Sequence, residues 1–327
     1  MSLVLQWLTA LAVMAVLPWF AVNNYQHFLL DLILINVILA IGLNVVKGFA
    51  GQVTVGHVAL MAVGAYASAI FSLKFGLPFW LALPAGVLVA IVAGLLVAVP
   101  SFRLEGAYLA LATLGLAESV RIFISATDYL GAAIGLSDIP APSFFGFVLD
   151  THLRYYYVVM PLAMLGIYFS QQMLSSSVGR AFMAIREDPL AAEASGVNVR
   201  FYKSLAFGIS ALYAGFAGGL MAHMTPGFIH PNNYTLVEMV SVLLMIILGG
   251  IGNIWGGIVG AIVVTIIYDL TRDYYQIQMI LFGSIIVLTV MFMPSGIGGV
   301  IGRRIKNRRF IALRKMTTQL KSDRNDS

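Results

Sequence analysis

The chain has 327 residues; 60% are hydrophobic, only 10% are charged, and the formal net charge is +5. Soluble domains carry about 25% charged residues, so this composition excludes an ordinary soluble protein. The absence of cysteine excludes disulfides, thiolate nucleophiles and cysteine-based metal sites. The chain instead contains many apolar runs close to the ~20 residues that a spanning helix requires, which predicts an all-α polytopic membrane protein.

Ten apolar runs follow one another along the chain, and we predict that each forms a transmembrane or partly re-entrant helix. The eighth and ninth are short and are separated by the glycines of GGIGNIWGG, so half-helices and a tight helical hairpin both remain open. The ten runs lie at residues 3–22, 28–46, 54–73, 79–99, 107–125, 155–172, 203–224, 236–250, 253–269 and 277–293.

Lys and Arg are divided unequally between the two sides of these helices. With ten spans, 15 of them fall on one side, including the whole tail from Arg303 onward, and three fall on the other. The positive-inside rule places the richer side, and with it both termini, in the cytoplasm. We predict one transmembrane domain at 1–302 and a basic cytoplasmic tail at 303–327, which lies against anionic membrane lipid or binds a partner. Basic residues gathered at membrane ends do not indicate nucleic-acid binding.

The 126–154 segment is predicted to be a long loop on the external side. It contains Pro140 and Pro142 and the pair Phe144 and Phe145, and it has no strong helical period. Loops of this length are uncommon in compact proteins and tend to be functional or disordered. The aromatic residues form either part of an interfacial belt or part of a docking surface, and both interpretations remain open.

The cytoplasmic loop at 177–203 has well-marked helix boundaries. Asp188 is a good N-cap, Pro189 suits the first helical position, and Gly196 can adopt the left-handed conformation that ends a helix. A helix of about two turns is marginal alone in water, so we expect this one to be held by docking to another protein.

Just upstream, the loop continues as an amphipathic segment. Phe182 and Ile185 lie three residues apart and therefore share one face of a second short helix. The loop is interpreted as two short helices that couple the membrane domain to a cytoplasmic partner. The alternative is an ordinary amphipathic loop resting on the membrane surface.

Three stretches resemble the permease subunits of branched-chain amino-acid ABC importers, and most closely their LivM-type half. GRAFMAIREDPLAAEASGVN (179–198) resembles the family's cytoplasmic loop that docks on the ATPase. GLNVVKGFAGQVTVGHVALMAVGAYASAI (42–70) resembles its membrane signature, and LGGIGNIWGGIVGA (248–261) matches its Gly-Gly-x-Gly region. One departure is QVTV at 52–55, where many relatives carry Leu-Leu-Ser-Leu, and it weakens any inference about the solute.

The resemblance implies the ABC importer permease fold and a chain that forms half of a translocation pathway in the bacterial inner membrane. Its implied partners are a LivH-like second permease, two cytoplasmic ATPases that hold ATP and magnesium, and an external substrate-binding protein. The chain itself would be non-catalytic and without a cofactor, because its sequence shows no phosphate-binding P-loop. The implied ATPase-coupling residues are Gly179, Arg180, Arg186, Glu187, Asp188, Pro189, Ala192, Glu193 and Gly196.

Two alternatives to this function remain. A permease for urea or short-chain amides would also suit a glycine-rich pathway with few fixed charges. An ATP-independent secondary transporter would need intramembrane carboxylates for coupling and no docking loop, and the sequence shows the reverse.

Polar residues and glycines inside the apolar runs are the candidate pathway or gate. The alternative is that the glycines serve close helix packing and that Asn44 and His57 bond between helices. Glu118 and Arg121 are predicted to form an ion pair, whereas Glu238 and Asp269 are expected near external helix ends, where water solvates them. No metal site is expected. The candidates are Asn44, Gly48, Gly51, His57, Gly64, Tyr66, Thr113, Glu118, Gly249, Gly252 and Asn253.

Overall fold

A computed structural model describes residues 9–299, except 10, 13, 145–146 and 294–295. It confirms helices at nine of the ten expected runs. Of the first expected helix at 3–22, residues 3–8, 10 and 13 lie outside the described residues, while residues 9, 11, 12 and 14–16 are helical and Leu17–Phe20 form a 3₁₀ turn, η1. Both termini and the basic tail at 303–327 also lie outside the described residues. The nine helices are α2 (Asn24–Leu43), α3 (His57–Leu73), α4 (Phe79–Ala98), α5 (Gly106–Ala126), α6 (His152–Ser175), α9 (Val199–His223), α10 (Leu236–Gly249), α11 (Ile254–Thr271) and α12 (Tyr275–Phe292).

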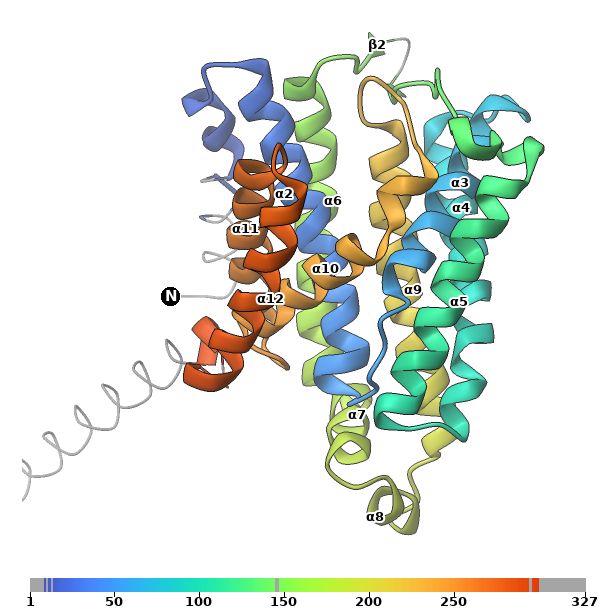
Figure 1. The fold of residues 1–327 in the computed structure, drawn as a ribbon, viewed down its shortest axis with the longest axis vertical. Helices are drawn as coiled ribbons and strands as arrows, with labels where there is room; N and C mark the ends of the chain where they lie inside the picture. Colours follow the sequence, from blue (N-terminus) through green and yellow to red (C-terminus); the bar gives the residue numbers. More distant parts are fainter. Residues whose placement is uncertain (1–8, 10, 13, 145–146, 294–295, 300–327) are drawn as a thin grey trace, which may run out of the picture.

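The bundle has two distinct ends (Figure 1). At the hairpin end, two short antiparallel strands, β1 (Ser143–Phe144) and β2 (Phe147–Val148), pair beside the 3₁₀ turns η4 (Asp128–Leu130) and η5 (Ala132–Ile134). At the opposite end, which we call the α8 end, lie α7 (Ser177–Glu187) and α8 (Pro189–Ala194). This hairpin is a local addition to a mostly helical fold, which agrees with the all-α expectation; two-residue strands leave no alternating pattern in a sequence.

Seven of the described helices are long and apolar enough to cross a membrane, namely α2, α4, α5, α6, α9, α11 and α12. Helices α3 and α10 have 17 and 14 residues, which is shorter than the ~20 residues of a full span. The chain is therefore a multi-pass helical membrane protein, and its described helices include seven that are long enough to span the bilayer and two shorter apolar ones.

The two short helices follow stretches of irregular backbone. α2 continues as a π-helix, η2 (Asn44–Phe49), after which residues 50–56 run extended back along the bundle, so that α3 begins at about half its height (Figure 1). α10 follows the 3₁₀ turn η6 (Pro231–Tyr234) and runs obliquely through the middle of the bundle. Irregular backbone is stable at membrane depth only where protein or a watery cavity covers it.

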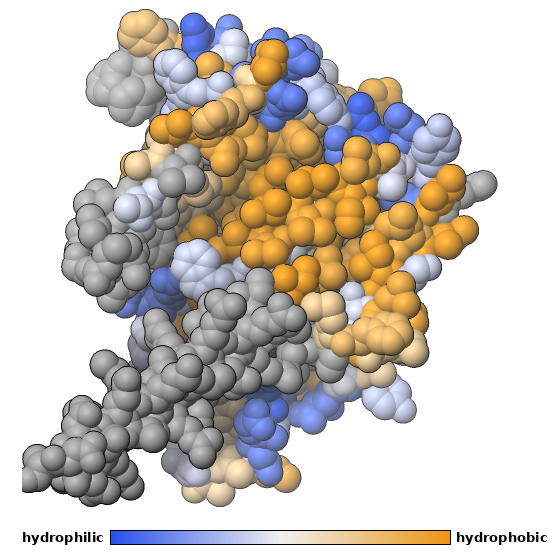
Figure 2. All heavy atoms as spheres, turned by 90° about the vertical axis from the view of Figure 1, so that its left-hand side faces the viewer, coloured by the Kyte–Doolittle hydropathy of each residue, from blue (hydrophilic) through white to orange (hydrophobic). Residues whose placement is uncertain are grey.

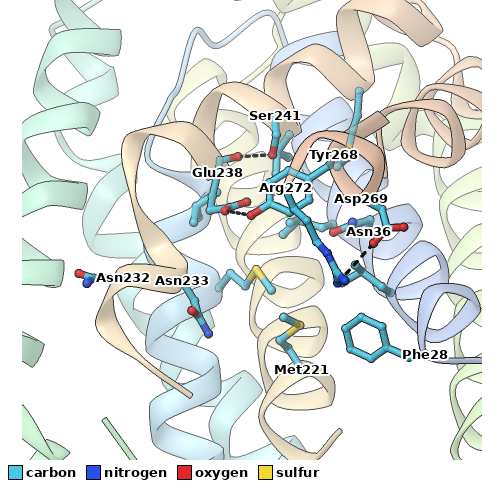
Figure 3. A pocket seen from close by; sticks show the side chains of 16 residues that line it. Phe28, Asn36, Met221, Asn232, Asn233, Glu238, Ser241, Tyr268, Asp269 and Arg272 are labelled. Atoms are coloured by element: carbon cyan, nitrogen blue, oxygen red, sulfur yellow. Dashed lines mark hydrogen bonds and ion pairs between the residues drawn. The ribbon is translucent and has the colours of Figure 1, made fainter. Parts of the chain in front are cut away.

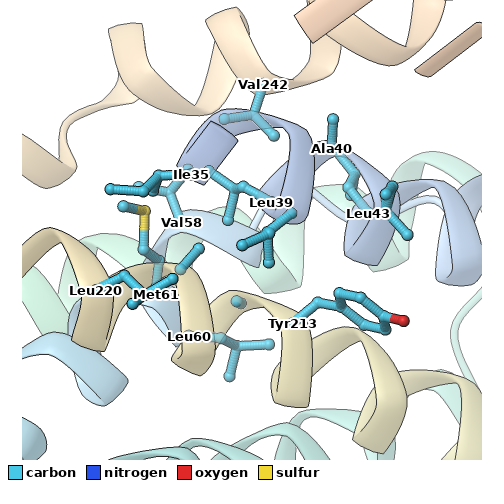
Figure 4. Packing of buried hydrophobic residues seen from close by; sticks show 14 of the residues in the cluster. Ile35, Leu39, Ala40, Leu43, Val58, Leu60, Met61, Tyr213, Leu220 and Val242 are labelled. Carbon is cyan, nitrogen blue, oxygen red and sulfur yellow. The ribbon is translucent and has the colours of Figure 1, made fainter. Parts of the chain in front are cut away.

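Helix α2 lies at the centre of the bundle, where it packs against α6, α9, α10 and α11, while α9 packs against α3 and α4. Figure 4 shows this core, in which Ile35 and Leu39 of α2 meet Val58 of α3, Leu220 of α9 and Val242 of α10. These five side chains are all buried. The core therefore fixes α3 and α10, the short helices, against the full-length ones.

The outer helices carry the apolar surface. Figure 2 shows a broad apolar band across the face formed by α11 and α12, with polar residues gathered toward both ends. Leu270 of α11 and Ile280 of α12 are 75% and 71% exposed. An apolar face of this extent would be unstable in water, so it indicates a surface that is covered by lipid or by another membrane subunit.

Candidate coupling site

Helices α7 and α8 at the α8 end both have side-chain N-caps, and that of α8 is the one the sequence predicts. The Ser176 hydroxyl accepts a hydrogen bond from the Val178 amide at 3.2 Å. Asp188 Oδ1 accepts from the amides of Leu190 and Ala191 at 2.9 and 3.1 Å, and Pro189 occupies the first helical position of α8. These side chains satisfy amides that a short helix would otherwise leave unpaired, so both helices have defined starts.

The apolar face of α7 is turned toward the bundle. Phe182 and Ile185 are buried, and Phe182 packs edge-on against Tyr202 at the start of α9. This face attaches the helix to the membrane domain. The predicted docking surface would therefore be the opposite, exposed face.

Most of the predicted coupling residues lie on that exposed face, but two do not. Gly179 and Ala192 are buried. A Cβ atom at Gly179 would collide with the carbonyl oxygen of Leu174, so glycine allows α7 to turn closely after α6. The exposed predicted residues are Arg180, Arg186, Glu187, Asp188, Glu193 and Gly196, with Pro189 partly buried beside them.

Sequence reasoning missed three apolar side chains on this surface. Leu190 is 78% exposed, Phe201 57% and Met183 44%. Leu190 lies two positions from the buried Ala192, and two residues span about 200° around a helix, so it points away from the bundle. That spacing is the signal that was available in the sequence. Large apolar side chains left exposed favour burial against a partner, because burial removes their surface from water.

Arg186 reaches from the docking surface into the membrane domain. Its guanidinium donates a hydrogen bond to the carbonyl oxygen of Gly48 in η2. Gly51 and Gly252 have left-handed φ values of 71° and 79°, and a Cβ atom on either would come within 2.9 Å of the Arg186 side chain. The glycines therefore make room for Arg186 as well as permitting the backbone turns.

Asn44, the first residue of η2, bonds to the turn between α10 and α11. Its Nδ2 donates to the carbonyl oxygen of Asn253 at 2.9 Å, and its Oδ1 accepts from the Gly252 amide at 2.8 Å. Asn253 in turn caps α11, because its Oδ1 accepts from the Gly256 amide at 3.2 Å. The structure thus brings together five of the predicted pathway residues, Asn44, Gly48, Gly51, Gly252 and Asn253, and joins them to α7.

Other predicted pathway residues serve helix packing. The buried His57 bonds through Nε2 to the Leu39 carbonyl at 3.0 Å and through Nδ1 to the Ser210 hydroxyl at 2.9 Å. A Cβ atom at Gly64 would collide with Gly215, and one at Gly249 would collide with the carbonyl oxygen of Gly256. For His57, Gly64 and Gly249, close packing is therefore the interpretation that the contacts favour. Within the described residues, no three His, Cys, Asp or Glu side chains group as metal ligands.

Tyr66, Thr113 and Glu118 lie apart from this group. Buried Tyr66 packs edge-on against Tyr234, with ring centroids 6.2 Å apart. Thr113 Oγ1 accepts from the Val55 amide at 3.1 Å, which ties the extended 50–56 segment to α5. Glu118 pairs with Arg121 as predicted, at 3.0 Å from Nε to Oε1, on the outer face of α5. The pair is partly exposed, and charged side chains are costly in hydrocarbon, so this part of the outer face of α5 must contact water or another protein as well as lipid.

The chain matches a family model described as the permease component of branched-chain amino acid transport systems over residues 27–293. It is 36% identical to the high-affinity branched-chain amino acid transport permease LivM of Escherichia coli K12, across 89% of this chain and 74% of the relative. The chain belongs to this permease family.

The permease also resembles the other named half of these systems, though less closely. It is 27% identical to LivH of Escherichia coli K12, across 80% of this chain and 90% of the relative. A probable LivM of Methanocaldococcus jannaschii is 25% identical, across 61% of each chain. The matched region at 27–293 contains every predicted coupling and pathway residue, so the site lies in the part that the family shares.

Two carboxylates of the permease lie in a different setting from the one expected. Glu238 and Asp269 were expected to be solvated at helix ends. Both instead line a cavity, in which Glu238 Oε1 accepts a hydrogen bond from the Tyr268 hydroxyl at 2.7 Å (Figure 3). Asp269 also accepts a hydrogen bond from Tyr25, which does not line the cavity. The difference arises because α10 begins inside the bundle, which carries Glu238 away from the surface.

Proposed function

We propose that this chain is the LivM-like half of an ATP-driven importer of branched-chain amino acids in the bacterial inner membrane. A LivH-like second permease forms the other half of the pathway, and an external binding protein delivers the solute. Two cytoplasmic ATPases bind and hydrolyse ATP with magnesium, so this chain contributes no catalytic residue and holds no cofactor. The family membership and the closer match to LivM than to LivH support this assignment.

In the proposed orientation, the hairpin end is external and the α8 end, both termini and the basic tail are cytoplasmic. The ten helices are then seven full spans, the first helix, and the two partly re-entrant helices α3 and α10. The unequal distribution of Lys and Arg supports this orientation. The 126–154 loop with its hairpin receives the binding protein.

The contact between Arg186 and Gly48 is the observation that carries the coupling mechanism. When the ATPases close, they push on α7 and α8, which are held to the bundle by buried Phe182 and Ile185. Arg186 transmits the movement to η2, and Asn44 transmits it to the α10–α11 turn. A rigid-body shift of these segments then switches access from one side to the other.

The test is purification of the tagged chain in mild detergent, with mass spectrometry of the proteins that accompany it. We expect two ATPases and a second permease to co-purify, and Glu193→Arg in the docking surface to release the ATPases alone. Asp128→Arg is the matched control, because it also reverses an exposed acidic residue but lies at the hairpin end. A chain that purifies alone and transports leucine in liposomes without ATP contradicts the proposal, and uptake of urea but not leucine contradicts the proposed solute.

A further inference from the structure

A cavity of about 280 Å³ lies among α2, α3, α10 and α11, and Figure 3 shows the side chains that line it. Ligand sites usually measure about 300–1,000 Å³, so this one has room for a single small solute. None of the predicted pathway residues lines it.

The cavity has one apolar wall and one polar wall. The apolar wall consists of the buried side chains of Leu39, Val58, Met61, Val242 and Met245. On the polar wall, Asn232, Asn233 and Arg272 are exposed, and Arg272 follows the end of α11 nearest the hairpin end. The cavity therefore meets solvent on its polar side and ends in an apolar pocket.

Glu238 supplies a carboxylate to the polar wall. It accepts a hydrogen bond from Tyr268, but no Lys, Arg or His among the described residues forms an ion pair with it. A partly buried carboxylate without a cationic partner is costly, because neutral hydrogen bonds replace its hydration only in part. A positively charged group on a ligand would supply the missing partner.

Arg272 supplies the opposite charge to the same cavity. Its guanidinium forms ion pairs with Asp269 and Asp273, each with 3.7 Å between nitrogen and oxygen, which is too long for a hydrogen bond, and it stands 5.0 Å from the centre of the Tyr25 ring. Guanidinium groups bind carboxylates through two parallel hydrogen bonds, and this geometry leaves donors for such a pair.

We propose that this cavity binds an α-amino acid as a zwitterion during its transport. The ammonium group pairs with Glu238, the carboxylate pairs with Arg272, and a branched apolar side chain packs against Met61, Val242 and Met245. The inference deepens the proposed function and rests on it. The cavity holds the carboxylates of Glu238 and Asp269 and the guanidinium of Arg272, and opposite charges in one cavity favour a zwitterion over a simple cation or anion. The apolar wall favours an aliphatic side chain.

The chain contains no cysteine, which allows a direct test by labelling. Ser241 lines the cavity, so Ser241→Cys introduces a single thiol there. The complex with the second permease and the ATPases is placed in nanodiscs without the binding protein, and labelling of this chain by a small methanethiosulfonate is followed by mass spectrometry. We expect L-leucine to slow labelling of Ser241→Cys but not of Ser137→Cys, an exposed position in the 126–154 loop.

Two analogues of leucine separate the roles of the charged residues. 3-Methylbutylamine lacks the carboxylate, and 4-methylpentanoate lacks the ammonium group. In the Ser241→Cys background, Glu238→Gln should weaken protection by leucine and by the amine roughly tenfold or more and leave protection by the acid unchanged. Arg272→Gln should weaken protection by leucine and by the acid and leave protection by the amine unchanged. A substitution that merely disturbed the fold would weaken both analogues alike.

The outcomes distinguish this inference from the function on which it rests. ATP-dependent leucine uptake with no protection of Ser241→Cys overturns the site and leaves the function standing. If Glu238→Gln and Arg272→Gln each weaken protection by the two analogues equally, the roles assigned to Glu238 and Arg272 are overturned. If the ATPases do not co-purify at all, the proposed function fails first.

Discussion

The guanidinium of Arg186 donates a hydrogen bond to the carbonyl oxygen of Gly48, which joins the exposed helix α7 to the π-helical end of α2. A charged side chain at the rim of the docking surface thus bonds to backbone inside the membrane domain. Hydrogen bonds of this kind to a charged group contribute about 1.5–3 kcal/mol.

We predict that Arg186→Gln leaves the complex assembled but uncouples it. Glutamine is shorter and uncharged, so it cannot hold the Gly48 carbonyl while α7 moves. In proteoliposomes we expect ATP hydrolysis to persist while leucine uptake per ATP falls. Arg103→Gln, which also changes an exposed arginine but lies outside the predicted coupling residues, should leave that ratio unchanged, and an unchanged ratio in Arg186→Gln would refute the transmission role.

Leu190 is predicted to be an anchor for the ATPase. It is 78% exposed at the tip of the α8 end. Burying a leucine contributes about 1.5–3 kcal/mol, so Leu190→Ser should raise the dissociation constant of the ATPases roughly tenfold or more. Ile134→Ser is the control, since Ile134 is 82% exposed at the hairpin end. The measurement is binding of purified ATPase to the permease pair in nanodiscs, and equal effects of the two variants would contradict the prediction.

The N-cap of α8 should be required for docking. Asp188 accepts hydrogen bonds from two amides at the start of the helix, and loss of such a cap costs about 1 kcal/mol. We expect Asp188→Ala to speed hydrogen–deuterium exchange across 189–195 and to weaken ATPase binding. Asp188→Asn keeps an acceptor oxygen and should restore both properties, so failure of this rescue would argue against a capping role.

The contact between the backbones of α10 and α11 is predicted to tolerate no side chain. A Cβ atom at Gly249 would meet the carbonyl oxygen of Gly256, a backbone atom that cannot rotate away. Overpacking of this kind costs about 1–3 kcal/mol, so Gly249→Ala should lower the melting temperature of the purified permease. Gly115→Ala, where a Cβ atom has nothing within 4 Å, should be neutral or slightly stabilising, because alanine favours helices more than glycine. Equal melting temperatures for the two variants would refute the packing argument.

The sequence was sufficient to predict the described helices and the boundaries of α8. Long apolar runs and residues such as Asp188, Pro189 and Gly196 act locally, so their effects do not depend on the rest of the fold. The grouping of Asn44 with Gly252 and Asn253 was not predictable in this way. It joins residues about 200 positions apart, which only the packed structure brings into contact.

The depth of individual residues in the membrane was also not predictable from the sequence. Glu238 was expected near a helix end with water around it, because its apolar run was assumed to start at the surface. The loop before α10 instead descends into the bundle, and η6 places the carboxylate beside Tyr268. Similarly, the direction in which Arg186 points depends on the space that Gly51 and Gly252 leave for it, rather than on its own helix.

Asn44 uses both ends of one amide group to hold the α10–α11 turn. Because the amide is planar and rigid, a rotation that breaks the bond to the Asn253 carbonyl also breaks the bond from the Gly252 amide. The two bonds therefore form or open together. We therefore expect a movement of α7 that turns the Asn44 side chain to break both bonds to the α10–α11 turn at once.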